Sequence, residues 1–334
     1  SYSGVYETGI YHFSSTANTV IAGNTVFLPG TKVVVEENAI IRIAPTARLE
    51  FWGDTEWKAN ADNKGLIVSN DSMYSHGRKQ DINQFDEIRF NNGSNIVNET
   101  IEGIVIKQTT NGFGFSGLNL HMKDCFLHSE QRAISTSNNT YVTIENSIIF
   151  GAASSVHSAV EIASCSGFLI KNCVFYLTPY GLRLTVVNEG TVDNNYFLTS
   201  NTAILAEFDV SATLINNTIH SSNIGIIGNL RTSISLTNND INARIGLDLS
   251  GAFTGGNALA NNFRCTERAI VYTSHYGGDF LATNSYWGAD NQQAISELIT
   301  DKNDFEPNHH YYNRYGIVVF MPYRTTAILN CGFR

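Results

Sequence analysis

The stretch Ile170-Lys-Asn-Cys-Val-Phe175 recurs in altered form along much of this chain. Each copy places an apolar residue before a polar residue, usually Asn, and an apolar or aromatic residue after it. Successive polar residues stand 22 to 26 positions apart. A sequence period of roughly 20 to 50 residues indicates a solenoid, in which each repeat forms one turn of a coil. The repeated polar position is occupied by Asp124, Asn146, Asn172, Asn194, Asn216, Asn238, Asn261 and Asn284.

A second repeated phrase precedes these positions by 13 to 15 residues, and it also alternates apolar and polar side chains. Such alternation predicts short strands, and no repeat leaves room for a helix of ordinary length. We therefore predict two or three strands per turn, with turns stacked about 4.8 Å apart. Equivalent Asn side chains would then lie in a single file at a tight bend and bond through their amides. The second phrase begins at Ala133, Ala159, Gly181, Ala203, Gly225, Gly246 and Ala269.

This pattern resembles the right-handed parallel β-helix superfamily, the pectate-lyase-like solenoids. The phrase Asn284-Ser-Tyr-Trp-Gly288 is similar to an N-x-Y-W-G phrase that precedes a short capping helix in many secreted and surface β-helix domains. The resemblance implies an all-β fold, a right-handed single-stranded parallel β-helix with about 22 residues per coil and a short C-terminal capping helix. Asp290 would cap this helix, with Gln293 at its third position.

The chain is expected to divide into three regions. Residues 1–22 are irregular and aromatic, and we expect them to form an N-terminal cap over the open first coil, which would otherwise pair with another chain. Residues 23–290 would form the β-helix, with a polar loop insertion at 54–85 that is one candidate site because long loops often carry function. Residues 291–334 would form the C-terminal cap of helix, loop and final strand.

Composition limits the classes of partner. Of 334 residues 15% are charged, and the formal net charge is −9. This balance argues against nucleic acid and anionic membrane surfaces, and an anionic polysaccharide would need a local basic patch or a bound cation. No apolar run reaches the roughly 18 residues that would predict a membrane span. The chain begins at Ser1 rather than Met, which fits removal of a signal peptide, so we expect a secreted or cell-surface protein.

The five cysteines are mostly expected to be buried fillers. Cys125 and Cys173 fall in one column directly after the repeated polar position, two turns apart. Two turns, roughly 9.6 Å, exceed the Cα separation that a disulfide allows. Spacing alone assigns no partner to Cys165, Cys265 and Cys331.

Two catalytic or nucleotide-binding motifs are not supported. Gly112-Phe-Gly-Phe-Ser-Gly117 satisfies G-x-G-x-x-G, but a strand rather than a helix is predicted to follow, so we interpret the glycines as a tight bend. Polygalacturonase-like members of the superfamily carry N-T-D, paired Asp and G-H-G phrases. Ser75-His76-Gly77 is the nearest approach to these phrases in this chain, which argues against pectin hydrolysis.

One loop near the end of the chain contains potential metal ligands. They are Asp301, Asp304, Glu306, His309 and His310. Their spacing matches neither an EF-hand nor a zinc motif. No cofactor or metal is therefore predicted, and Ca²⁺ in this loop remains the alternative.

The best candidate site follows from the second repeated phrase. Its second residue points inward and its third outward, so the outward residues form a column along the coil. That column is Ser135, Glu161, Arg183, Leu205, Ile227, Asp248 and Val271. The preceding turn supplies a column of Arg132, Ser158, Tyr180, Thr202, Ile224, Ile245 and Arg268, and a column of Gln131, His157, Pro179, Asn201, Asn223, Arg244 and Glu267.

These columns predict a site that could cleave or bind a glycan, because an acid, a base and an aromatic platform meet there. The catalytic candidates are Arg183, His157, Glu161 and Tyr180, and the substrate-binding candidates are Arg132, Arg244, Asp248 and Arg268. In lyases of this fold an Arg or Lys commonly abstracts the proton α to a uronate carboxylate, and the resemblance implies Arg183 in that role. An ordinary surface ion pair of Glu161 with Arg183 accounts for the same pattern without a site.

Two main functions remain open from the sequence. A regular stack without a recognisable catalytic set predicts an extracellular structural or adhesion-type protein, which presents an elongated surface to glycans or to copies of itself through the solenoid ends. The alternative is a β-helix polysaccharide lyase or glycosidase that acts on an extracellular polysaccharide. Fold does not dictate function, so enzymatic activity stays undecided, and a viral spike domain is a minor third alternative.

Overall fold

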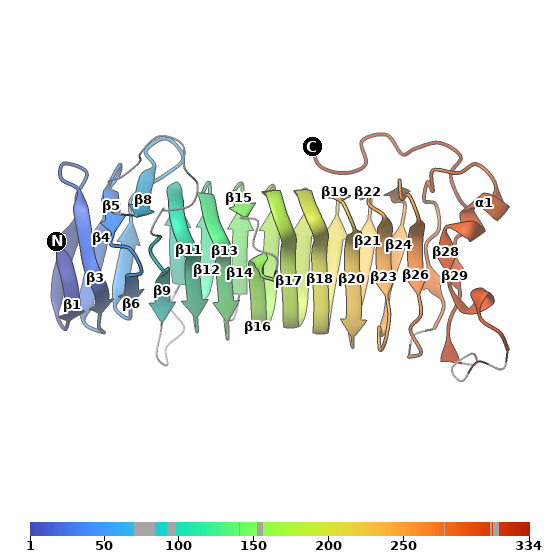
Figure 1. Ribbon diagram of the computed structural model, residues 1–334, viewed down its shortest axis with the longest axis horizontal. Helices are drawn as coiled ribbons and strands as arrows, with labels where there is room; N and C mark the ends of the chain where they lie inside the picture. Colours follow the sequence, from blue (N-terminus) through green and yellow to red (C-terminus); the bar gives the residue numbers. More distant parts are fainter. Residues whose placement is uncertain are drawn as a thin grey trace. The chain divides into compact units, whose positions relative to one another are not determined.

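The structure is a computed structural model that describes residues 1–69, 84–91, 98–139, 141–151, 156–276, 278–307, 309 and 314–334. The chain contains two compact units, Ser1–Cys165 and Ser166–Arg334. Each unit consists largely of strands that pair in parallel from one turn to the next (Figure 1). The predicted fold class, an all-β parallel solenoid, is confirmed.

The first unit is formed by strands β1 to β15 and part of β16. Their bounds are β1 Tyr2–Tyr6, β2 Gly9–Phe13, β3 Thr19–Phe27, β4 Thr31–Val35, β5 Ile40–Ile43, β6 Arg48–Phe51, β7 Asp54–Trp57, β8 Gly65–Ser69, β9 Glu87–Asn91, β10 Asn98–Glu102, β11 Ile104–Ser116, β12 Asn119–Lys123, β13 Phe126–Ser137, β14 Tyr141–Glu145, β15 Ile148–Gly151 and β16 Ser158–Lys171. Met122 of β12 lies opposite Ile144 of β14. These partners are 144 − 122 = 22 residues apart, which equals the predicted period.

The second unit continues with the same coil length. Its elements are β17 Val174–Asp193, β18 Tyr196–Ile215, β19 Thr218–Ser221, β20 Ile224–Leu230, β21 Ser233–Thr237, β22 Asp240–Asn242, β23 Ile245–Leu249, β24 Gly255–Leu259, β25 Asn262–Phe263, β26 Arg268–Tyr272, β27 Phe280–Leu281, α1 Gln292–Glu297, β28 Ile299–Thr300, η1 Lys302–Asp304 and β29 Val318–Val319. Leu182 lies opposite Ile204, and Ile204 opposite Ile226.

Inward-facing side chains form the core of each unit. In the second unit Leu182, Ile204, Ile226 and Leu247 form one column, and none of them has exposed surface. Burying each such side chain stabilises the fold by roughly 1.5–3 kcal/mol. Their neighbours in sequence point outward and are partly exposed, as the two-residue period of a strand requires.

The repeated polar residue adopts the left-handed conformation at the bend of each coil, with φ of 54° at Asp124 and 59° at Asn238. Asn tolerates this conformation better than most residues. In the second unit Asn194 donates to Asn172 Oδ1 over 2.8 Å, and Asn238 donates to Asn216 Oδ1 over 2.6 Å. The single file predicted for these side chains is confirmed.

One member of the predicted file is wrong by one residue. The left-handed residue after Asn238 is Ala260, with φ of 55°, and its carbonyl accepts from the Asn238 main-chain N–H. Asn261 belongs to the next column, which is buried. Because Asn261 and Asn262 are consecutive amides, the sequence pattern does not distinguish the two registers at this coil.

The column that follows the left-handed residue is a buried ladder of amides. Asn195, Asn217, Asn239 and Asn261 have no exposed surface. Asn217 Oδ1 accepts from both the main-chain N and Nδ2 of Asn195 over 3.0 Å, and Asn239 Oδ1 accepts from the same atoms of Asn217 over 2.9 Å. Each side chain thus satisfies a main-chain donor at the bend, which would cost about 1–3 kcal/mol if left unpaired.

Cysteines occupy this buried column in earlier coils. Cys125 and Cys173 are both buried, and Ser147 Oγ accepts from the Cys125 main-chain N over 3.1 Å. No disulfide joins any two of the five cysteines, all of which lie in the described ranges. The expectation of buried fillers is confirmed for Cys125, Cys165 and Cys173, whereas Cys265 and Cys331 are partly exposed.

Two parts of the expected organisation differ in the structure. Residues 1–22, expected to be irregular, contain strands: β1 pairs with β3 and β2 with β4, because the segment already follows the coil register. In the expected loop insertion 54–85, β7 pairs with β4 and β8 with β5, so these strands stay in the stack. Residues 70–83 of the insertion lie outside the described residues. The three-region division as a whole remains a prediction.

A short helix packs at the end of the second unit. The N-cap of α1 is Asn291 rather than Asp290, because Asn291 Oδ1 accepts from the Ala294 main-chain N over 2.9 Å. Trp287 is buried and stacks on Phe263 with ring centroids 4.9 Å apart. Across the ranges that the structure covers, no helix has the length and apolar character needed to cross a membrane.

Candidate functional site

The outward column predicted from the sequence is present in each unit. In the first unit Ser135 lies opposite Glu161, and the register extends the column back through Gly114, Arg89 and Glu50. We call these five residues and their immediate neighbours the outward face. In the second unit the column contains Arg183, Leu205, Ile227, Asp248 and Val271.

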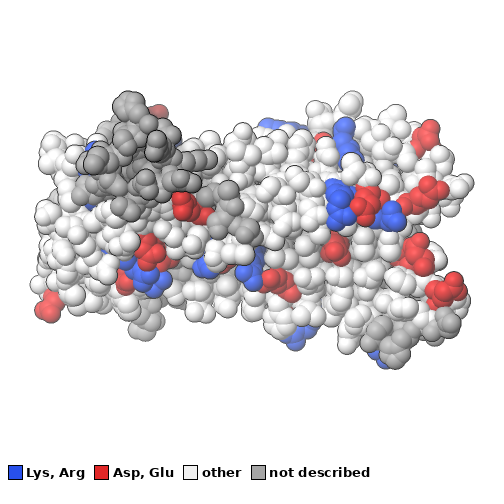
Figure 2. Space-filling model, in the orientation of Figure 1, with Lys and Arg blue, Asp and Glu red and all other residues white. Residues whose placement is uncertain are grey.

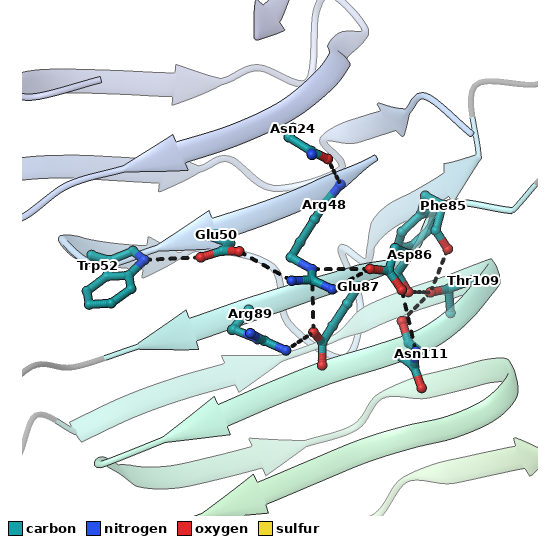
Figure 3. Close-up of polar contacts among 10 residues, drawn as sticks. All are labelled: Asn24, Arg48, Glu50, Trp52, Phe85, Asp86, Glu87, Arg89, Thr109 and Asn111. Carbon is teal, nitrogen blue, oxygen red and sulfur yellow. Dashed lines mark hydrogen bonds and ion pairs between the residues drawn. The ribbon is translucent and has the colours of Figure 1, made fainter. Parts of the chain in front are cut away.

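A network of ionic contacts occupies one end of the outward face (Figure 3). Arg48 Nη2 lies 2.5 Å from Asp86 Oδ2, and Arg48 Nε lies 3.8 Å from Glu87 Oε2. Arg89 Nη2 lies 2.7 Å from the same Glu87 oxygen. The pKa of Arg48 is raised, first by its hydrogen bonds to Asp86. Both arginines are more than one-third exposed, so the network adds little stability, but it fixes the position of Glu87.

A polar groove of about 280 Å³ lies beside this network. It is lined by Glu87, Arg89, Asn91, Gly114, Phe115, Ser116, Ser135 and Ser137. The groove is hollow because glycine and serine replace the long charged side chains of the coils beside it. A Cβ atom at Gly114 would lie 2.5 Å from Glu87 Oε1, so a larger residue there would displace the end of the Glu87 side chain. Only 9% of the Glu87 side chain is exposed, so its carboxylate is held against Gly114 and away from bulk water.

Three predicted site residues meet at the other end of the outward face. Arg132 Nε lies 3.2 Å from Glu161 Oε2, and Arg132 Nη2 lies 3.2 Å from His157 Nδ1. A guanidinium has only donors, so His157 Nδ1 accepts and the proton of a neutral ring resides on Nε2. Because Glu161 is the strand partner of Ser135, this cluster borders the polar groove.

An exposed tryptophan flanks the groove on a second side. Trp52 is 39% exposed, and its Nε1 donates to Glu50 Oε2 over 3.2 Å (Figure 3). It lines a hollow of about 160 Å³ that shares Asn91 with the polar groove. An exposed indole whose N–H is hydrogen-bonded offers its apolar ring face to a ligand beside polar partners. Sequence reasoning missed both Trp52 and Glu87, because the break after β6 hid the register between β6 and β9.

A buried carboxyl group closes this second hollow. Glu99 is only 8% exposed, and Thr55 Oγ1 donates to its Oε1 over 2.5 Å. Burial raises the pKa of Glu99 to about 7, against the lowering effect of its hydrogen bonds with Thr55 and Trp57. The sequence carried a signal for this residue, since Glu99 alternates with the buried Ile101 and so must point inward.

The predicted site residues of the second unit form separate local contacts. Arg183 Nη2 donates to Glu207 Oε2 over 2.7 Å, and Tyr180 OH accepts from Asn201 Nδ2 over 2.7 Å. A guanidinium bound to a carboxylate stays protonated, so this contact gives no support to a proton-abstracting role. Arg183 and Glu161 belong to two different units. A common site formed by both residues therefore remains a prediction.

Two of the remaining predicted residues of the second unit, Arg244 and Arg268, bond to residues outside their own coil. Arg244 bonds to Asn223 Oδ1 and Glu267 Oε2, while Arg268 Nε donates to Thr300 Oγ1 over 3.1 Å. Burial raises the pKa of Asp248. These contacts are compatible with an ordinary polar surface, and substrate binding by Arg244, Asp248 and Arg268 is not tested by them.

Two of the potential metal ligands near the end of the chain, Asp301 and Asp304, bond to main-chain N–H groups. Asp301 Oδ1 accepts from the Asn303 N–H and its Oδ2 from the Val318 N–H, while Asp304 Oδ2 accepts from the Asp301 N–H. His310 lies outside the described residues. Within the part of the chain that the structure describes, no group of three His, Cys, Asp or Glu side chains is placed to hold a metal ion.

The charged side chains on the surface form small, separate groups. In Figure 2 the basic side chains mostly contact acidic ones, and uncharged surface separates these groups. Among the described residues that Figure 2 shows, the basic side chains form no broad patch that would attract an anionic polymer. The arrangement can therefore supply paired donors and acceptors to an uncharged, hydroxyl-rich ligand.

Comparison with known families matched residues 88–275 to a family described as periplasmic copper-binding protein (NosD). Comparison with curated proteins and with solved structures found no match. The residues that the structure describes do not fit a copper ion, because their thiols are dispersed and burial raises the pKa of Cys125 and Cys265 to about 12. The predicted resemblance to parallel β-helix proteins is confirmed, while the N-x-Y-W-G resemblance stays a prediction. The match covers more than half of the 334 residues of the chain, and the chain therefore belongs to the NosD family.

Proposed function

We propose that this protein is a periplasmic or extracellular β-solenoid that binds an uncharged glycan in the polar groove of its first unit. The observation that carries the proposal is the groove itself. There a carboxylate, a guanidinium, an amide and three hydroxyl groups converge next to the exposed indole of Trp52. Such paired donors and acceptors suit vicinal sugar hydroxyls, and the indole suits the apolar face of a pyranose ring.

The charge of the groove favours an uncharged ligand. Glu87 and Arg89 neutralise each other across 2.7 Å, so the lining has no excess of positive charge. The whole chain carries a formal charge of −9, which repels uronate polymers at long range. The groove volume of about 280 Å³ is also just below the usual range for small-molecule pockets, so we expect weak binding by each site.

Other functions of the chain receive less support. Cleavage by Arg132, His157 and Glu161 would require a carboxyl group free to act as acid or base, but Glu161 is paired with Arg132. Self-association through the solenoid ends and an adhesion role remain proposals. Copper binding belongs to the description of the family, and no cluster of three His, Cys, Asp or Glu side chains among the described residues supports it for this chain.

Intrinsic fluorescence provides the test, because two of the three tryptophans, Trp52 and Trp57, lie in the first unit near the groove. We expect neutral oligosaccharides from a panel of glucans, mannans and peptidoglycan fragments to change this fluorescence in a saturable way. Trp52→Ala should abolish binding. Tyr276→Ala is the matched control, since Tyr276 is 67% exposed in the second unit.

A second pair of variants tests the groove without touching the reporter. Ser137→Leu fills the groove and should abolish binding, whereas Ser235→Leu places the same side chain on an outward position of β21 in the second unit and should not. Equal affinities of the two leucine variants, or binding confined to charged polymers, would reject the proposal.

A further inference from the structure

The last eleven residues of the sequence lie along the bend of the second unit, where they cross several coils (Figure 1). Arg324 N donates to Ser285 O over 2.9 Å at one end, and Arg334 N donates to Asn194 Oδ1 over 2.8 Å at the other. The segment therefore runs along the coil axis, across the strands, for about four coil spacings or roughly 19 Å. We call residues 324–334 the tail.

Amide side chains of the coil hold the tail through its main chain. Asn262 Oδ1 accepts from Ile328 N over 2.8 Å, and Asn262 Nδ2 donates to Ile328 O over 3.1 Å. Asn194 contacts Arg334 in the same two-bond manner, over 2.8 Å and 3.2 Å. Each side-chain amide thus supplies the donor and the acceptor that a neighbouring strand would supply to an added peptide strand.

Between these two clamps the contacts depend on the tail sequence. Gly332 N donates to Asn238 O over 2.9 Å, and Phe333 N donates to Thr218 Oγ1 over 2.9 Å. Gly332 has φ of +95°, and a Cβ atom there would clash with Thr218 Oγ1. Only glycine fits this position, so the surface distinguishes one peptide from another.

The tail is held by few buried side chains. Leu329 is 87% exposed and Phe333 is 38% exposed, while Gly332 is buried. Hydrogen bonds to a solvated surface contribute only about 1 kcal/mol each, so such a segment opens more easily than the coils beneath it. The surface that it covers is therefore accessible to a competing segment of the same sequence.

Cys331 Sγ also donates to Asn239 O over 3.1 Å. We propose that the tail track, formed by Asn194, Thr218, Asn238, Asn239, Asn262 and Ser285, is a peptide-binding site specific for segments like Ile328–Arg334. The occupant we assign to it, when the chain's own tail is displaced, is the tail of a second copy. The glycine requirement at position 332 supports this choice, because the second copy supplies the sequence that already fits. Exchange of tails joins two copies without any change in the coils.

Direct binding of a peptide tests the track in the full chain. Gly332→Val in the chain should release its own tail while leaving the track intact. A fluorescein-labelled peptide of residues 324–334 should bind this variant by anisotropy, and bind the wild-type chain at least tenfold more weakly, because the attached tail competes at high effective concentration. A peptide with Gly332→Val should bind neither chain.

Variants of the track provide the matched comparison. Adding Asn262→Ala to the Gly332→Val chain removes two hydrogen bonds and should weaken peptide binding about 30-fold. Asn257→Ala, on β24 of the same unit and outside the track, should leave it unchanged. Equal binding of the native and Gly332→Val peptides to a folded chain, or no binding of either, would overturn the proposal.

Hydrogen exchange of the wild-type chain keeps the test decisive if Gly332→Val does not fold. The amides of Ile328, Gly332 and Arg334 should exchange at least tenfold more slowly than in the free peptide, and Asn262→Ala should remove this protection at Ile328. Exchange at the free-peptide rate in the wild-type chain would contradict the tail track.

Complementation tests the second copy. A chain with Gly332→Val lacks a docking tail, and a chain with Asn194→Ala and Asn262→Ala lacks the two clamps. Neither variant should form a homodimer alone. A mixture of the two should give a 1:1 heterodimer, measured by light scattering. A mixture that stays monomeric at millimolar concentration would refute tail exchange, even if the peptide binds.

Discussion

The buried amide ladder makes a quantitative prediction for Asn217→Ala. Asn217 Oδ1 is the partner of Asn195 N over 3.0 Å, and Asn217 Nδ2 donates to Val192 O over 2.8 Å. Alanine leaves the Asn195 main-chain donor buried without a partner, which costs about 1–3 kcal/mol. The other lost bonds add roughly 1 kcal/mol, so we expect a loss of about 2–4 kcal/mol in the free energy of unfolding.

Two matched variants separate this cause from a general loss of the side chain. Asn216→Gly changes the neighbouring amide at the surface and keeps the left-handed conformation, φ 57°, accessible. It should cost less than about 1 kcal/mol. Asn217→Ser should recover about half of the loss, because Ser285 in the same column accepts from Asn261 N over 3.1 Å and donates to Ala258 O over 3.1 Å.

Urea unfolding followed by far-ultraviolet circular dichroism measures these differences, provided that the dependence on urea stays the same among the variants. For a unit of this size, about 2–4 kcal/mol corresponds to a fall of roughly 10 °C in the melting temperature. The ladder argument is refuted if Asn217→Ala costs no more than Asn216→Gly. It is also refuted if Asn217→Ser is as unstable as Asn217→Ala.

Three further predictions concern single groups. The pKa of Glu99 is raised to about 7 in the folded state, so the carboxyl group loses its proton at lower pH in the unfolded chain. The free energy of unfolding therefore falls as pH rises from about 4.5 to 7. Urea titrations at pH 5 and 8 should show that Glu99→Gln removes about 3 kcal/mol of this fall. Cys125, with a pKa of about 12, should resist Ellman's reagent at pH 8 until the chain unfolds. Burial raises the pKa of the partly exposed Cys331 to about 11, so Cys331 should react slowly in the native chain and faster after Gly332→Val, which releases the tail. A Cβ atom at position 256 would clash with Ile234 O, and the φ of +130° is strained for any residue but glycine. Gly256→Ala should therefore lower the free energy of unfolding in urea by at least about 3 kcal/mol. Gly251→Ala, where Cβ has room, should lower it by about 1 kcal/mol.

The fold could be predicted because its cause is repeated in the sequence. One residue of each coil must adopt the left-handed conformation, and Asn meets that need at Asn172, Asn194, Asn216 and Asn238. The register fails at Ala260, where the conformation persists without the amide. A sequence pattern records the residue type, whereas the structure conserves the backbone conformation, so one coil with an atypical residue is enough to shift the register.

The site could be predicted only where the coil register was known. Arg132, His157 and Glu161 come together as expected, because alternation along one strand fixes which side chains share a face. Glu87 and Gly114 escaped the same reasoning. Their contact joins two strands across a break in the repeat, and the reason for a glycine at 114 is visible only from the Glu87 oxygen above it.

The bonding capacity of the amides in the second unit explains where the tail binds. In the buried column Asn217 and Asn239 use both amide atoms on the coils themselves, so no bonding capacity remains for a ligand. By contrast, Asn194 at the bend and Asn262 in the column of Thr218 and Asp240 bond to the main chain of the tail with both amide atoms. Asn262 is buried when the tail is in place. The tail is therefore held by amides of two different columns, and not by the column that closes each turn of the solenoid.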